Sequence, residues 1–155
     1  GDRLWYYGSG CYTGQEGRMW PNRWICGFGL WISGTEGEWS WTFMRPKDSA
    51  FNDFDGEAQR EAKDAMITYP SEGDEPPLPT PQWEGIREGV NDFKYMYTAR
   101  ILAERIGGDK GRKALAELDR LTSDLPWGIA PPQATPQNLD AWRSRAAAII
   151  RKLIE

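Results

Sequence analysis

The chain has 155 residues, a formal charge of −4, a pI near 5.0, 39% hydrophobic residues and 27% charged residues. This composition is typical of one globular domain and argues against a nucleic-acid partner, which needs clustered lysine and arginine. No apolar run approaches the roughly 20 residues that cross a bilayer, so we expect no membrane partner.

The residue types also restrict the chemistry. The chain contains no histidine, which excludes a Ser-His-Asp triad, a Cys-His dyad and His-ligated zinc, and we expect neither a metal nor a cofactor. Cys11 and Cys26 either pair or remain free, and neither lies in a CxxC motif. Nine tryptophans are unusual for this length, and indole rings serve both cores and sugar-stacking clefts.

The first part of the chain predicts a βαβ unit. Residues 3–7 (RLWYY) read as a short buried strand that is followed by a glycine-rich loop. A helix is predicted from Pro21 to Ser33, with Trp24, Phe28 and Trp31 on one face. Period-2 aromatic residues then indicate a strand over 38–43, which we expect to be parallel to the first.

The second part of the chain predicts three helices. Residues 47–80 are acidic and proline-rich, with a short helix-like stretch and a brief strand-like one. Thr-Pro pairs at 80–81 and 135–136 are helix-start signals, and Gly107 with Gly108 marks a helix end. The spacing predicts helices over about 81–106, 110–123 and from 136 onward. The predicted core positions of the first are Ile86, Val90, Phe93, Tyr97 and Ile101.

Several motifs together resemble the C-terminal part of the catalytic barrel of glycoside hydrolase family 123 and related uncharacterised bacterial proteins. Trp41 fits a tryptophan at a strand end, and Tyr69 with Pro70 fits a "YP" loop. A helix with the pattern R-[DE]-G-[IV]-x-D-[YF]-x-Y is matched by Arg87, Glu88, Gly89, Val90, Asp92, Phe93 and Tyr95. The resemblance covers about residues 4–105.

The resemblance implies an α/β fold: the C-terminal portion of a (β/α)8 TIM-like barrel followed by a helical tail. Residues 1–80 would hold the last strands and loops, and residues 81–155 a three-helix region. A barrel needs eight strands, so the remainder of the barrel, a missing N-terminal part, would be a partner of this chain. The alternative is that the βαβ unit and the helices form a small complete α/β domain.

The site candidates follow from the barrel rule that chemistry gathers at the C-terminal ends of strands. Glu16, in the loop after the first strand, is a weak catalytic candidate. Trp41 either stacks on a sugar ring or packs with its neighbouring aromatic residues, and Tyr12, Tyr69 and Arg45 are candidate substrate-binding partners. The Asp-Glu pair that catalyses the family's substrate-assisted reaction lies earlier in the family barrel, so the catalytic acid is expected to be missing.

A structural role is predicted for the charged residues of the signature helix. Glu88 and Asp92 are like charges at i and i+4, which indicates an external arginine or lysine nearby.

Three functions remain open on these grounds. The first is a C-terminal fragment of a glycoside hydrolase that acts on N-acetylhexosamine-containing glycans and is inactive alone. The second is a non-catalytic carbohydrate-binding module, and the third is a structural interaction domain. The resemblance implies an extracellular or periplasmic location, whereas the residues themselves leave the compartment open.

Overall fold

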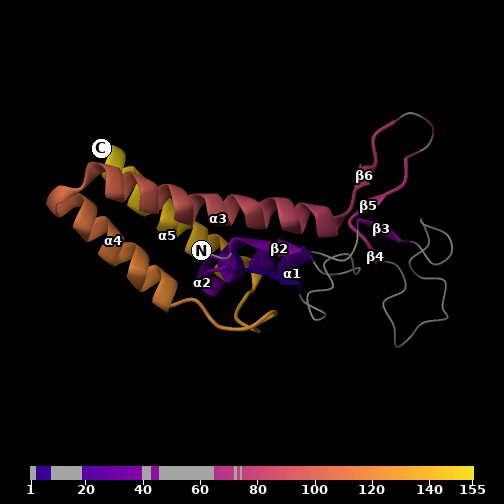
Figure 1. Cartoon of the computed structure of the whole chain (residues 1–155), viewed down its shortest axis with the longest axis horizontal. Coiled ribbons are helices and arrows are strands. Elements are labelled where there is room, and N and C mark those ends of the chain that lie inside the picture. Colours follow the sequence, from indigo (N-terminus) through magenta and orange to yellow (C-terminus); the bar gives the residue numbers. More distant parts are fainter. Residues whose placement is uncertain (1–2, 8–18, 40–42, 46–64, 72, 74) are drawn as a thin grey trace.

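The computed structural model describes residues 3–7, 19–39, 43–45, 65–71, 73 and 75–155. The elements in chain order are β1 (Trp5–Tyr7), α1 (Met19–Trp24), η1 (Ile25–Gly29), α2 (Leu30–Ser33), β2 (Gly37–Trp39), β3 (Met44–Arg45), β4 (Ala65–Met66), β5 (Thr68–Tyr69), β6 (Leu78–Pro79), α3 (Pro81–Ile106), α4 (Gly108–Ser123) and α5 (Pro136–Ile154). Helices α1, η1, α4 and α5 all pack on α3, which runs along the helical part of the molecule, above the other helices in the view of Figure 1.

Two of the three long helices, α3 and α5, begin where their capping signals predict. The Thr80 hydroxyl accepts a hydrogen bond from the Trp83 backbone N–H at 3.2 Å, and Thr135 caps α5 in the same way through Asn138. Gly107 ends α3 with φ +60°, a conformation that favours glycine, and α4 follows at once. The prediction of these helices is therefore confirmed, although α4 begins slightly earlier than predicted.

The predicted core face of α3 is confirmed only in part, because Ile86 and Phe93 are half-buried and pack against the core. Val90 and Tyr97 are exposed, and the buried positions are instead Gln82, Gly85, Gly89, Asp92, Met96, Ala99 and Ala103. Small residues on this face let neighbouring helices approach closely. A Cβ built on Gly89 would lie 2.6 Å from the Arg23 carbonyl oxygen, so only glycine fits at this crossing.

The residues predicted to form one helix over 21–33 form α1, η1 and α2, which begin at Met19. The change from α1 to η1 places Gly27 in a non-helical conformation (φ −116°, ψ −105°), with its backbone against Gly89. Trp24, Phe28 and Trp31 are buried, as their spacing predicts.

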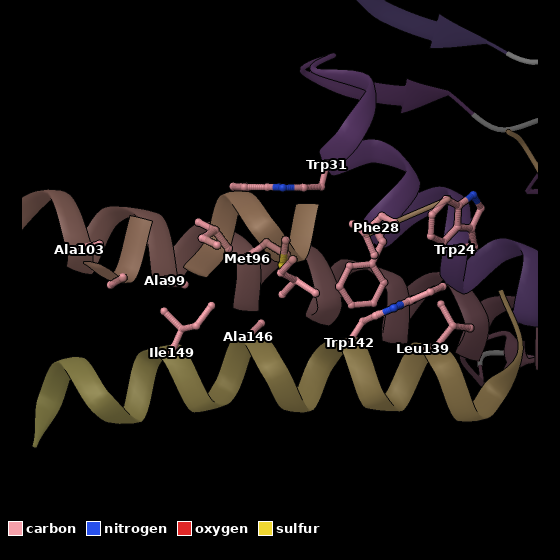
Figure 2. Close-up of a cluster of buried hydrophobic side chains, with 14 of the residues drawn as sticks. Trp24, Phe28, Trp31, Met96, Ala99, Ala103, Leu139, Trp142, Ala146 and Ile149 are labelled. Atoms are coloured by element: carbon pink, nitrogen blue, oxygen red, sulfur yellow. The ribbon is translucent and has the colours of Figure 1, made fainter. Parts of the chain in front are cut away.

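The core lies where these N-terminal helices meet α3 and α5 (Figure 2). The ring centroids of Trp24 and Phe28 each lie 5.7 Å from that of Trp142 on α5, and Phe28 meets Trp142 edge to face. Met96, Ala99 and Ala146 fill the space between α3 and α5 along the same seam.

The expected barrel portion is contradicted by the structure. The described part of the chain is mostly helical, and its strands form three separate two-stranded pairs: β1–β2, β3–β4 and β5–β6. The β1–β2 pair is parallel, with Trp5 opposite Gly37 and Tyr7 opposite Trp39, which confirms the predicted relation of these two strands. The prediction of a barrel rests on two parallel strands joined by a helix, and many α/β arrangements share that local pattern.

Candidate functional site

Most of the predicted site residues lie outside the described residues. Tyr12, Glu16 and Trp41 belong to this group, so their proposed roles remain predictions. The backbone of Arg45 forms part of β3, but its side chain is outside the described part of the molecule. Tyr69 lies in β5 and is half-buried.

An exposed aromatic surface lies on the β1–β2 pair. In the parallel register Trp5, Tyr7 and Trp39 share one face of the pair, and we call these three side chains the aromatic face. They are 54%, 61% and 65% exposed. The rings of Trp5 and Trp39 are tilted by 58° with their centroids 6.5 Å apart, and the Trp5 ring covers Gly37, where a Cβ would come within 2.8 Å of it. The aromatic face is therefore a pair of indoles and a phenol held in a defined arrangement.

Sequence reasoning did not find this surface. The sequence predicts residues 3–7 to be a buried strand, and it selects Trp41, not Trp39, as the candidate for sugar stacking. The available signal was the register: two parallel strands of three residues place Trp5, Tyr7 and Trp39 on the same face. The other face meets the helices, since Glu38 lies 4.0 Å from the Sγ of the buried Cys26.

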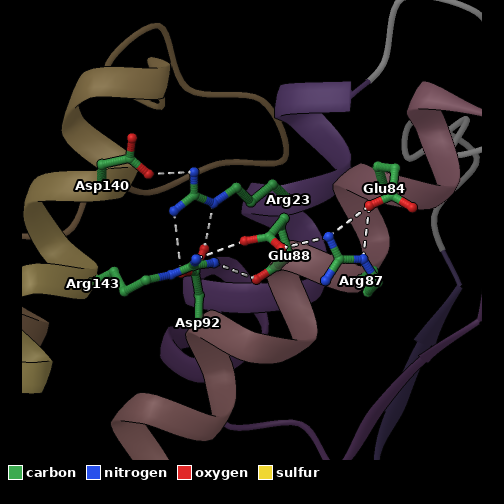
Figure 3. Close-up of polar contacts among 7 residues, drawn as sticks. All are labelled: Arg23, Glu84, Arg87, Glu88, Asp92, Asp140 and Arg143. Atoms are coloured by element: carbon green, nitrogen blue, oxygen red, sulfur yellow. Dashed lines mark hydrogen bonds and ion pairs between the residues drawn. The ribbon is translucent and has the colours of Figure 1, made fainter.

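An ionic cluster centred on a buried carboxylate ties helices α1, α3 and α5 together (Figure 3). Asp92 of α3 is completely buried and accepts two hydrogen bonds from Arg23 of α1, at 2.7 Å from Nε and 3.3 Å from Nη2. Arg143 of α5 also donates its Nε–H to Asp92. One carboxylate thus joins three helices that are far apart in the sequence.

Two further carboxylates balance the arginines. Arg23 donates from Nη1 to Asp140 at 2.7 Å. Arg143 donates from Nη1 to the Glu88 carboxylate at 2.6 Å and from Nη2 to the Glu88 backbone oxygen at 2.9 Å. Every guanidinium nitrogen of these two arginines has a partner, as buried charges require.

The environment changes the pKa of Glu88 and of Asp92. Hydrogen bonding from Arg143 lowers the pKa of Glu88 below its ordinary value, and burial only partly opposes this. Burial raises the pKa of Asp92, and the hydrogen bonds from Arg23 and Arg143 limit that rise. Asp92 is closed to solvent and fully engaged, so its geometry suits a structural ion pair rather than proton transfer to a substrate.

The cluster explains the two acidic residues of the signature on α3, Glu88 and Asp92. The prediction that Glu88 and Asp92 need an external cation is confirmed by Arg143, which contacts both carboxylates. The prediction could not say which cation, because Arg143 follows Asp92 by 51 positions. Gly89 lies between them at the helix crossing and allows Arg23 to reach the cluster.

Among the described residues, no group of three His, Cys, Asp or Glu side chains could hold a metal ion. None of the helices in this part of the chain is long and apolar enough to span a bilayer. Comparisons with family models, curated proteins and solved structures find no match to this chain.

Proposed function

We propose that this chain is a non-catalytic part of a glycoside hydrolase that acts on N-acetylhexosamine-containing glycans, and that its aromatic face binds sugar. The exposed arrangement of Trp5, Tyr7 and Trp39 carries this proposal. A pyranose presents a face of C–H groups that stacks on flat aromatic rings, and exposed indoles at a defined spacing supply such a surface.

The helical part of the chain supports the aromatic face. Glu36 of the turn before β2 donates its backbone N–H to the Leu4 carbonyl at 2.9 Å, and the β1–β2 pair rests on η1 through Glu38 and Cys26. The ionic cluster holds α1, which continues directly into η1, and Phe28 of η1 packs in the aromatic core. Sugar binding on such a support needs little reorganisation of the protein, which limits the entropic cost of binding.

The proposal leaves bond cleavage to residues outside this chain. Asp92 and Glu88 are committed to Arg23 and Arg143. The family resemblance also places the catalytic Asp-Glu pair in a region that this chain does not match. We therefore expect no hydrolysis of a chromogenic N-acetylgalactosaminide by this chain, and measurable turnover would contradict the non-catalytic part of the proposal.

Sugar binding is tested by titrating the protein with N-acetylgalactosamine and N-acetylglucosamine and following the indole N–H signals by NMR. Trp39→Ala is expected to weaken binding about fivefold, which corresponds to ~1 kcal/mol. The matched control is Trp127→Ala, because Trp127 is 78% exposed and lies in the loop between α4 and α5. Equal affinities for the wild type and both variants would refute a role for the aromatic face.

A second candidate is a protein-interaction domain, and the β1–β2 pair favours it. Parallel strands are normally covered on both faces. Within the described part of the chain, no further strand pairs with either outer edge of β1–β2, and the aromatic face is open. If this face binds a second copy of the chain, sedimentation velocity will show self-association that Trp39→Ala abolishes, and N-acetylhexosamines will not shift the indole signals.

A further inference from the structure

We propose that a hollow between α3 and α5 binds a sugar that carries a carboxylate, such as a uronic acid. The hollow is open to solvent on one side and has a volume of about 560 Å³. Its lining consists of Asn91, Lys94, Tyr95, Thr98, Arg143 and Ile150. No residue of β1 or β2 contributes, so the inference is independent of the aromatic face.

The charge of the lining favours an anionic group. The lining contains two cations and no carboxylate, although the chain as a whole carries a formal charge of −4. Lys94 is exposed and makes no ion pair with any described residue. The negative net charge of the chain does not attract anions, so an anionic ligand would be held in the hollow by its contacts with the lining residues.

The Arg143 side chain lines the hollow in a fixed position. Its guanidinium is held by Glu88 and Asp92 and lies 5.9 Å from the centroid of the Tyr95 ring. Because these two carboxylates already balance its charge, Lys94 supplies the unbalanced positive charge. The expected contact is a charge-assisted hydrogen bond from the Lys94 ammonium to the ligand carboxylate.

The remaining lining residues favour a sugar over a bare carboxylate. Asn91 and Thr98 carry an amide and a hydroxyl that make no side-chain hydrogen bond to another described residue, so both are available to sugar hydroxyl groups. The Tyr95 ring and Ile150 add apolar surface for pyranose C–H groups. A simple carboxylate would use Lys94 and leave the rest of this lining without contacts.

The test is an NMR titration of the whole chain with methyl β-D-glucuronide, with methyl β-D-glucoside and with acetate. The glucuronide is expected to shift the backbone signals of residues 91–98 and 143–150 in a saturable way. The neutral glucoside should bind about tenfold more weakly, and Lys94→Gln should weaken glucuronide binding by about the same factor. Lys113→Gln on α4 is the matched control and should leave binding unchanged.

Thr98→Val separates a sugar from a carboxylate ligand, because it removes a hydroxyl from an exposed helix position and keeps the size of the side chain. It should weaken binding of the glucuronide several-fold and leave that of acetate unchanged. The inference is overturned if the glucuronide and the glucoside bind equally, if Lys113→Gln has the same effect as Lys94→Gln, or if no signal in these segments shifts. It is also overturned if acetate or an acidic dipeptide binds as tightly as the glucuronide.

Discussion

Replacing Asp92 with asparagine is expected to destabilise the protein strongly, because it leaves two arginines without their shared counter-ion. The side chain of Arg23 is only 4% exposed. Removing one partner of a buried ion pair costs about 3–5 kcal/mol. Arg23 retains Asp140, and Arg143 retains Glu88. We therefore expect Asp92→Asn to lower the free energy of unfolding by about 3 kcal/mol, the lower end of that range. A typical domain has a free energy of unfolding of roughly 5–15 kcal/mol.

The loss is measured by urea unfolding at neutral pH and by the change in Tm, which should fall by about 6–12 °C for a chain of this size. A double-mutant cycle with Arg143→Gln should be non-additive, with the double variant more stable than the two single losses predict. The matched control is Glu117→Gln, which removes an exposed pair with Lys152 and should cost less than about 0.5 kcal/mol. A loss below about 1 kcal/mol for Asp92→Asn, or strict additivity in the cycle, would refute a structural role for the cluster.

Three further predictions concern the helices. Gly89→Ala should destabilise the protein, because the added Cβ would meet the Arg23 carbonyl oxygen and this clash should cost more than the ~1 kcal/mol that alanine gains over glycine in a helix. An unchanged or higher free energy of unfolding would contradict this. The pKa of Glu88 is lowered in the folded protein, so its ionised carboxylate adds about 1 kcal/mol to the free energy of unfolding above its unfolded pKa near 4.5. This stabilisation is lost as the pH falls through the folded pKa. In urea unfolding, the stability difference between wild type and Glu88→Gln should shrink below that range, and a difference independent of pH would count against it. Trp142→Ala should cost about 3–5 kcal/mol, whereas Trp127→Ala should change the free energy of unfolding by less than about 0.5 kcal/mol.

The helix ends could be predicted from the sequence because their signals are local. A capping threonine followed by proline needs only its own first turn to act, and the two positive-φ glycines at 107–108 need only the turn between α3 and α4. The buried stripe of Trp24, Phe28 and Trp31 could be predicted for the same reason, since large aromatic side chains at helical spacing seldom remain exposed together.

Apolar periodicity predicts only part of the buried face of α3. Hydrophobic spacing selects large residues such as Val90 and Tyr97, whereas close packing at this crossing selects Gly85 and Gly89. A buried aspartate opposes the same rule, because its place in the core depends on arginines from other helices.

The expected barrel failed for a related reason. A strand, a helix and a second strand predict a parallel pair, and the structure confirms that β1 and β2 form one. Such a pair occurs in many larger arrangements besides a barrel. The number of strands that join it depends on contacts distant in the sequence, which local patterns do not report. The aromatic face was missed because its exposure depends on whether other strands or helices cover the pair.

The long sequence separation within the ionic cluster has a consequence for how the protein acquires its structure. Arg23 and Asp140 are 117 positions apart, and Trp24 and Phe28 complete their packing only against Trp142. During synthesis the N-terminal tryptophans leave the ribosome long before α5 exists, and their indoles have no permanent neighbours until then. We expect α3 and α4 to form early through local contacts and the N-terminal helices to dock last, so that a nascent chain halted before α5 remains a target for chaperones.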